Sequence, residues 1–230
     1  MPFKNIRRFF RNDEKKTKGL PVSPITVTPP PVVDVDKEVH TDARREVWES
    51  KFELHPVVYN AQDKKPRDPR TFIFDRSYIL EDAVHKYHLK GSTDEETMLN
   101  CCLFVQDHVK YVSDSKSRRQ TEYWQNPEDT LTRGTGDCED GAILMKSLTL
   151  VAGIPDWKVK IVAGHVRGGG HAYCTFITKN DRQVIMDWCY WPTRAGFSSR
   201  KTIKEDERYG EVWFSFNHNH TYSGKSRTYS

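Results

Sequence analysis

The sequence predicts an α+β fold in which helices come first along the chain and an antiparallel sheet follows. From about residue 41 to residue 153, apolar residues recur at the spacing of amphipathic helices. From residue 157 to residue 217, apolar and polar residues alternate with a period of two, and short turn sequences separate the alternating stretches. A run of helices followed by a run of strands is typical of α+β domains, with the helices packed on the sheet.

The first 40 residues differ in composition from the rest of the chain. Residues 1–20 carry a net charge of +5, although the whole chain of 230 residues carries only +4. They could form a short amphipathic helix that docks on a partner protein or an anionic surface, or they could be a frayed terminus. The Pro-rich stretch that follows is typical of an extended linker. We therefore expect an arm over 1–40, one domain over 41–217 and a polar tail over 218–230.

Composition excludes several classes of protein. The mean hydropathy is −0.76, and no apolar run approaches the roughly 20 residues that a membrane span needs. The basic N-terminus lacks the apolar segment of a secretory signal, which predicts a cytoplasmic protein or one incorporated in an assembly such as a virion. The five cysteines are odd in number and have no CxxC spacing, so we expect reduced thiols, no metal site and no cofactor. Because the excess positive charge lies in the arm, it gives no support for nucleic-acid binding by the domain.

Three helical stretches precede the centre of the chain. The first, TDARREVWESKFEL, has Thr41 as a candidate N-cap and Val47, Trp48 and Phe52 as its apolar stripe. Residues 56–74 are rich in proline and charge, so we expect them to be irregular.

The second helix is predicted over residues 76–89 and stops at Gly91. The third begins with Ser92 followed three residues later by Glu95, which is the pattern of a capping box. Cys101 and Cys102 lie in this third helix, and the helical spacing of its apolar residues predicts that both are core thiols.

A fourth helix follows the stretch RGTGDCED, and it places a cysteine at its first turn. Asp137 is the expected N-cap and forms a capping box with Asp140, so Cys138 occupies the first helical position. Backbone N–H groups and the helix dipole at that position favour thiolate over thiol, and thiolate is the nucleophilic form. The alternative is a buried structural cysteine without chemistry.

Four strands are predicted over 157–166, 171–178, 183–191 and 211–217. His171 opens the second of them after three glycines, where its ring could reach from the sheet towards the cysteine-bearing helix and act as a base. The other histidines suit surface or core positions, and His218 with His220 lacks a third metal ligand nearby.

Asp187 is the acidic residue inside the third strand, where an unpaired carboxylate would be costly, so it is the candidate to orient His171. A regular two-residue turn at Asn180-Asp181 would pair residue 178 with residue 183 and would put Asp187 on the opposite face from His171. The assignment therefore predicts an odd loop or a bulge between residues 177 and 184, which shifts the register by one residue.

The stretches YWQNPEDTL, GDCEDGAIL, GGGHAY and IMDW, in this order, resemble the transglutaminase-like superfamily, and especially its bacterial cysteine-proteinase branch. The resemblance spans residues 77–191. One departure is Trp188, because an asparagine typically follows the acidic residue in that branch. Members of this superfamily also occur in phage structural gene clusters, so the resemblance includes a phage-encoded protein.

The resemblance implies a papain-like fold in which Cys138 is the nucleophile, His171 the general base and acid, and Asp187 the orienting carboxylate. It implies a thioester intermediate formed from a protein, peptide or other amide, followed by hydrolysis or by transfer to an amine. Trp124 and Gln125 are candidates for an oxyanion hole together with the Cys138 backbone N–H, and Trp124 could equally be a core aromatic. The alternative function is a structural or interaction protein, such as a phage virion component, anchored by the arm over 1–40.

Overall fold

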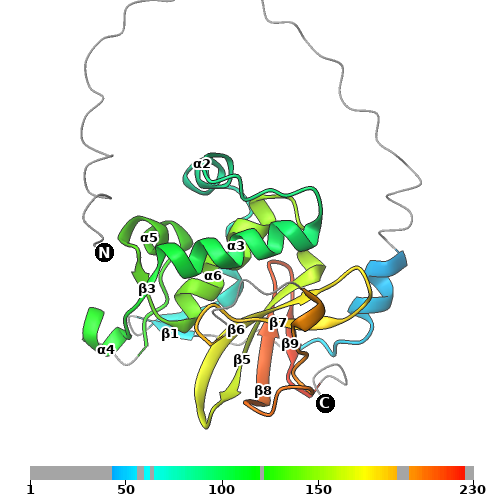
Figure 1. The fold of residues 1–230 in the computed structure, drawn as a ribbon. Coiled ribbons are helices and arrows are strands. Elements are labelled where there is room, and N and C mark those ends of the chain that lie inside the picture. Colours follow the sequence, from blue (N-terminus) through cyan, green and yellow to red (C-terminus); the bar gives the residue numbers. More distant parts are fainter. Residues whose placement is uncertain (1–42, 56–59, 63–64, 120–121, 191–196, 226–230) are drawn as a thin grey trace, which may run out of the picture. The chain divides into compact units, whose positions relative to one another are not determined.

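The computed structural model describes residues 43–55, 60–62, 65–119, 122–190 and 197–225 (Figure 1). The expected arm, the Pro-rich linker and the candidate N-cap Thr41 lie outside these residues.

A five-stranded antiparallel sheet forms the second half of the chain, in the order β7-β6-β5-β8-β9 (Figure 1). Its strands are β5 (Val159–Val166), β6 (Gly169–Ile177), β7 (Gln183–Met186), β8 (Tyr209–Phe216) and β9 (Thr221–Ser223). The four predicted strands are thus present, and β9 is an addition.

The strand β9 lies in the stretch 218–230 that the sequence assigned to a polar tail. It pairs with β8, and the Tyr222 side chain is buried. The Ser223 N–H also donates to the Glu53 carbonyl, which links β9 to the first part of the chain. The domain therefore continues past residue 217. The sequence does not predict this, because a strand of only three residues is too short to show an apolar pattern.

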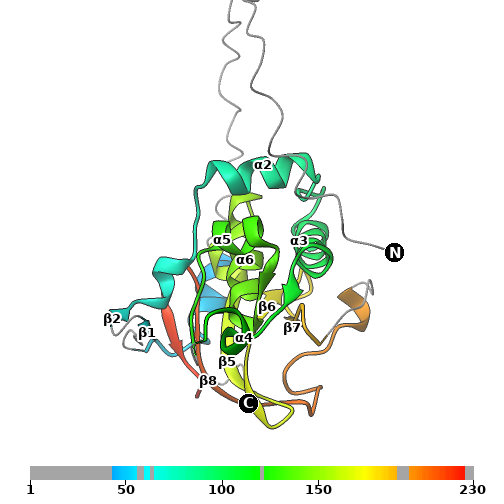
Figure 2. The same cartoon turned by 90° about the vertical axis from the view of Figure 1, so that its left-hand side faces the viewer.

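The helices of the first half are α2 (Tyr78–Lys86), α3 (Asp94–His108), α4 (Asp114–Ser117), α5 (Pro127–Arg133) and α6 (Cys138–Val151). Helix α6 packs against β5 and β6 on one side and against α2, α3 and α5 on the other. Figure 2 shows α6 between α3 and α5. The mixed helix and sheet architecture confirms the predicted α+β class.

Short elements complete the fold. A helix over residues 43–49 precedes a hairpin, and brief 3-10 turns and bridges connect the larger elements. These short strands and 3-10 turns are β1 (Asn60–Gln62), β2 (Lys65–Arg67), η2 (Pro69–Phe72), β3 (Lys110–Tyr111), β4 (Thr135–Gly136), η3 (Asp156–Lys158) and η4 (Phe197–Ser199). The expectation of an irregular stretch over 56–74 was therefore too simple.

Both faces of the sheet are buried, because alternate strand residues belong to different cores. Ile161 and Phe176 lie in the core shared with the helices, whereas Val162 and Tyr173 lie in a second core with Trp48 and its neighbours. Two buried faces explain why β5 and β6 are almost continuously apolar.

Two details of the predicted helices differ from the structure. Val47 is exposed, so the buried stripe of the first helix consists of Trp48 and Phe52 without it. The N-cap of α3 is Thr93, which accepts the Glu96 N–H, so the capping residues lie one position after the predicted Ser92 and Glu95. Cys101 and Cys102 are fully buried in α3, as predicted.

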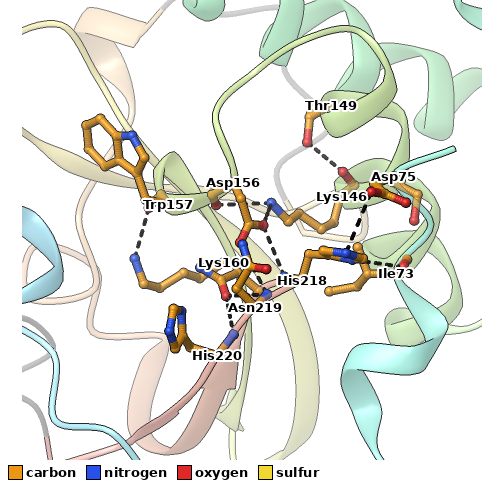
Figure 3. Close-up of polar contacts among 12 residues, drawn as sticks. Ile73, Asp75, Lys146, Thr149, Asp156, Trp157, Lys160, His218, Asn219 and His220 are labelled. Atoms are coloured by element: carbon orange, nitrogen blue, oxygen red, sulfur yellow. Dashed lines mark hydrogen bonds and ion pairs between the residues drawn. The ribbon is translucent and has the colours of Figure 1, made fainter. Parts of the chain in front are cut away.

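A buried ion pair connects the middle of α6 to Asp156, which lies just before β5 (Figure 3). The Lys146 ammonium is fully buried and lies 2.7 Å from Asp156 Oδ1. The same carboxylate accepts the backbone N–H of His218 at 3.0 Å and the Asn219 side-chain amide at 2.9 Å. One carboxylate thus joins α6, η3 and the turn between β8 and β9.

Among the residues that the structure describes, no helix has the length and apolar character needed to cross a lipid bilayer.

Candidate active site

The chain turns sharply before α6 and so places Cys138 at the first helical position. Gly134 ends α5 in the left-handed conformation, with φ of 62°. Gly136 lies close to Asp140, where an added Cβ would come within 2.6 Å of the Asp140 Cβ. The predicted capping box is present, and Asp140 Oδ2 accepts the Asp137 N–H at 3.2 Å. The glycine before the N-cap therefore leaves room for the capping carboxylate.

His171 and Asp187 lie next to each other at the end of the sheet. His171 Nε2 is 2.8 Å from Asp187 Oδ2, and both side chains are buried. Because Asp187 occupies Nε2, the other ring nitrogen, Nδ1, is the one left to exchange a proton with a reacting group.

The hairpin between β6 and β7 has the register shift that this contact requires. Phe176 pairs with Val184 and Ile177 with Gln183, which continues to Thr178 opposite Arg182. The loop is thus three residues long, and its last residue, Asp181, has φ of 56°. An odd loop puts residues 171 and 187 on the same face of the sheet, so the predicted irregularity between residues 177 and 184 is confirmed.

Asp187 is held by four hydrogen-bond donors. Besides His171, its Oδ2 accepts the Tyr209 hydroxyl at 2.7 Å, and its Oδ1 accepts the backbone N–H groups of Cys189 at 2.7 Å and Tyr190 at 3.2 Å. These donors satisfy a carboxylate that is fully buried. Tyr209 is not predictable from its local sequence, because it is 22 residues away from Asp187 and reaches the site only through the pairing of β8 with β5.

The surroundings of the Cys138 thiol favour its protonated form, whereas its position at the start of a helix predicts the thiolate. Burial and the neighbouring Glu139 carboxylate raise its pKa well above the ordinary value. The thiol donates to Glu139 Oε2 at 3.0 Å, which also favours the protonated form. Burial and the Glu139 carboxylate therefore act against the decrease in pKa that the helix dipole is expected to cause.

The two oxyanion-hole candidates occupy different surroundings. Trp124 lines the same pocket as Cys138, and its indole N–H donates to Glu122 Oε1 at 2.6 Å. Gln125 is buried, and its side-chain amide donates to the Thr135 carbonyl and to Asp140 Oδ2. Both amide hydrogens of Gln125 are thus used to hold the start of α6, so its side chain is a structural support.

A pocket of about 430 Å³ opens beside Cys138 and His171. Its walls come from the start of α6, the segment before α5, and the strands β5, β6 and β8. The lining residues are Pro69, Glu122, Trp124, Cys138, Glu139, Ala163, Gly170, His171, Ala172, Trp213 and Phe214. A thiol and an imidazole that line one pocket are the groups that acyl transfer requires.

Two groups of side chains in the described part of the chain could hold a metal ion. One comprises Asp114, Asp137 and Asp140, and the other His171, Asp187 and Cys189. The second is already paired internally through the His171–Asp187 hydrogen bond. In the first, Asp137 Oδ1 is buried without a hydrogen-bond partner among the described residues, and burial raises the pKa of Asp114 to about 6 and that of Asp140 to about 7. Oxygen donors of this kind fit a hard divalent cation.

Comparison with known proteins agrees with the fold described above. The sequence model of the transglutaminase-like superfamily matches residues 82–188, whereas no curated protein sequence matches the chain. The structure of LapG from Legionella pneumophila is similar with a TM-score of 0.50 at 18% identity, over 81% of this chain and 89% of that chain. A structure of EGTA-treated LapG gives a TM-score of 0.49 at 19% identity, over 80% and 85%. The segment that carries Cys138, His171 and Asp187 thus lies within the part of the chain that is similar to the transglutaminase-like superfamily.

Proposed function

We propose that this protein is a cysteine-dependent amide hydrolase or acyltransferase that acts on a protein or peptide. Cys138 is the nucleophile, His171 the general base and acid, and Asp187 the group that orients His171. The observation that carries the proposal is the buried 2.8 Å contact between His171 Nε2 and Asp187 beside a pocket that Cys138 also lines. A nucleophile, a base and an orienting group in this order form the general pattern of covalent acyl transfer.

The reaction runs in two halves. His171 Nδ1 takes the Cys138 thiol proton, and the sulfur attacks the carbonyl carbon of the amide. The tetrahedral oxyanion then collapses, the C–N bond breaks, and the leaving amine takes the proton from His171. The resulting thioester is attacked by water or by a second amine, whose proton returns through His171. Water gives hydrolysis and an amine gives acyl transfer.

The backbone N–H of Cys138, at the first position of α6, is the proposed oxyanion donor. Trp124 also lines the pocket, but its indole N–H is engaged by Glu122 Oε1, so it is not proposed as a second donor. Gln125 is not proposed as a donor, since both of its amide hydrogens are used elsewhere.

Asp114, Asp137 and Asp140 would hold a divalent cation if one binds beside this site. Such a cation would supply positive charge that offsets the carboxylates next to the thiol. No step of the reaction above is routed through it.

The proposal is tested by site-resolved alkylation of the intact protein with iodoacetamide between pH 5 and 9, read by mass spectrometry. We expect Cys138 to be alkylated through proton transfer to His171, although its thiol is protonated at rest, and His171→Ala to remove this reaction. An equal rate of Cys138 alkylation in the wild type and in His171→Ala would reject His171 as the base of this thiol.

A second measurement separates the two outcomes of the thioester. The protein is incubated with casein in the presence and absence of a dansylated primary amine. New peptide termini indicate hydrolysis, dansyl incorporation indicates transfer, and Cys138→Ala should abolish both. The alternative role in an assembly depends on the arm over 1–40, which lies outside the described residues.

A further inference from the structure

Trp213 points into the pocket because β8 contains a bulge at this residue. Along β5, Ala163 pairs with Phe214 but the next residue, Gly164, pairs with Val212, so Trp213 is the extra residue on β8. A β-bulge re-aims the side chain at which it occurs, and bulges are frequent next to active sites. Here it turns an indole into the cavity that Cys138 and His171 line.

The Trp213 indole packs against residues of the neighbouring strands. It lies over Gly170, where an added Cβ would come within 3.0 Å of the ring. The His165 ring meets it edge-on at a centroid distance of 5.0 Å. Trp213 nevertheless remains 45% exposed, which is unusual for a tryptophan without a partner to cover it. An aromatic surface is thus held ready at the rim of the pocket.

Glu122 brings a carboxylate to the same pocket. Its Oε1 accepts the Trp124 indole N–H at 2.6 Å, which fixes the side chain, and the residue is exposed to solvent. Among the described residues that line the pocket there is no lysine or arginine to neutralise it. Glu139, the other carboxylate there, is engaged by the Cys138 thiol. The pocket therefore offers one anchored negative charge and one exposed aromatic ring.

A carboxylate and an aromatic face in one cavity are suited to a cation, because both attract positive charge. We propose that Glu122 and Trp213 form a specificity site that binds the basic side chain of a lysine or arginine close to the scissile amide of the substrate. This inference rests on the proposed function, since it assigns a substrate class to the same pocket. Gly170 contributes by leaving the space into which the substrate backbone and the indole fit.

The first test profiles cleavage in a library of proteome-derived peptides by mass spectrometry. Wild-type protein should show lysine and arginine enriched at one position within two residues of the cleaved bond. Glu122→Gln should reduce kcat/KM for such peptides roughly tenfold, the loss expected from removing one charge-assisted contact. Glu122→Lys should shift the preference at that position towards aspartate and glutamate.

Variants at Trp213 and a matched control complete this test. Trp213→Ala should raise KM for basic peptides, whereas Trp213→Phe should retain most of the preference because it keeps an aromatic face. Glu211→Gln, an exposed carboxylate on β8 outside the pocket lining, should leave the profile unchanged. A wild-type profile without enrichment, or an unchanged preference in Glu122→Lys, would overturn the inference while leaving the proposed function intact.

The second test needs no catalysis. The Cys138→Ala protein is titrated with acetyl-arginine amide and with acetyl-citrulline amide, which has nearly the same shape without the charge, and the tryptophan fluorescence is followed. We expect tighter binding of the arginine compound and loss of this difference in Cys138→Ala/Glu122→Gln. If no peptide is cleaved but the difference is present, the proposed chemistry fails and the cation site stands. Equal binding of the two compounds rejects the site.

Discussion

Glu139 follows Cys138 in the chain and controls its acidity. The Cys138 thiol donates to Glu139 Oε2 at 3.0 Å, and burial together with this carboxylate raises the pKa of the thiol. Burial and the neighbouring Asp137 also raise the pKa of Glu139, because a second negative charge is unfavourable in this poorly solvated site. In the proposed reaction Cys138 therefore starts as a thiol, and His171 has to take its proton.

This arrangement predicts the effect of Glu139→Gln. Removing the carboxylate takes away a negative charge beside the sulfur, so the pKa of Cys138 should fall. Each unit of decrease raises the thiolate fraction about tenfold at pH values below that pKa. The rate of Cys138 alkylation at pH 8 is the measurement, with Glu211→Gln as the control. A rate equal to or below that of the wild type would show that the carboxylate does not restrain the thiol.

Single residues also show how far the sequence could predict the site. Cys138, His171 and Asp187 are predicted as site residues because each is unusual for its local pattern, and the structure places His171 and Asp187 in contact. Tyr209 was missed because a tyrosine at the start of a strand is ordinary, and only the β5–β8 pairing brings it to Asp187. The raised pKa of Cys138 was missed because burial cannot be inferred from a helix N-terminus alone.

Among the elements, α6 is positioned at its start and in its middle by buried polar contacts. Its start is tied by Gln125 and Asp140, and its middle by the Lys146–Asp156 pair (Figure 3). Burial lowers the pKa of Lys146, and Asp156 opposes that effect. Since α6 carries Cys138, loss of the pair should make the helix that holds the proposed nucleophile less stable.

Removing one partner of this pair should be costly. Asp156→Asn leaves the fully buried Lys146 ammonium without its counter-charge, so the free energy of unfolding should fall by about 3–5 kcal/mol. Lys146→Met should cost less, because Asp156 keeps the His218 and Asn219 donors. Urea denaturation of both single variants and the double variant measures the coupling. Glu49→Gln, which breaks the exposed pair with Arg45, should cost under about 1 kcal/mol, and an equally small loss in Asp156→Asn would contradict the argument.

Elements with strong periodicity could be predicted, and short elements set by long-range contacts could not. The helix α6 and the strands β5, β6 and β8 follow apolar patterns that are visible in the sequence. The three residues of β9 are polar on average and gain their strand conformation from β8 and from the Glu53 carbonyl. The odd hairpin loop was predictable only by combining strand register with the chemistry that Asp187 was expected to perform.

At the scale of the whole molecule, the sheet is covered on both faces, and the second core contains an unusual buried cation. Lys160 on β5 is only 1% exposed and its Nζ donates to the Trp157 carbonyl at 3.0 Å (Figure 3). The ammonium also lies 3.8 Å from the centroid of the Phe52 ring and 5.1 Å from that of Tyr222. Burial lowers the pKa of Lys160 to about 7, with Lys146 adding to the decrease and Asp156 and Glu49 opposing it.

This pKa predicts how the stability of the domain depends on pH. In the unfolded chain the Lys160 pKa returns to about 10.5, so between pH 7 and 9 the unfolded state binds more protons and the stability rises with pH. Below pH 7 the folded state carries the buried Lys160 charge, and the full desolvation cost of this charge lowers the stability. Asp114 and Asp140, with pKa values raised to about 6 and about 7, act mainly at lower pH and in the opposite direction.

Urea denaturation at pH 7, 8 and 9 of the wild type and of Lys160→Met isolates this effect. The methionine keeps the length of the side chain and has no proton to lose. The wild-type free energy of unfolding should rise by about 2 kcal/mol across the window, since one pKa unit corresponds to about 1.4 kcal/mol, and Lys160→Met should lack this rise. An equal dependence of the free energy of unfolding on pH in both proteins would show that another group titrates between pH 7 and 9. Lys160 would then not be the cause of the expected rise in stability.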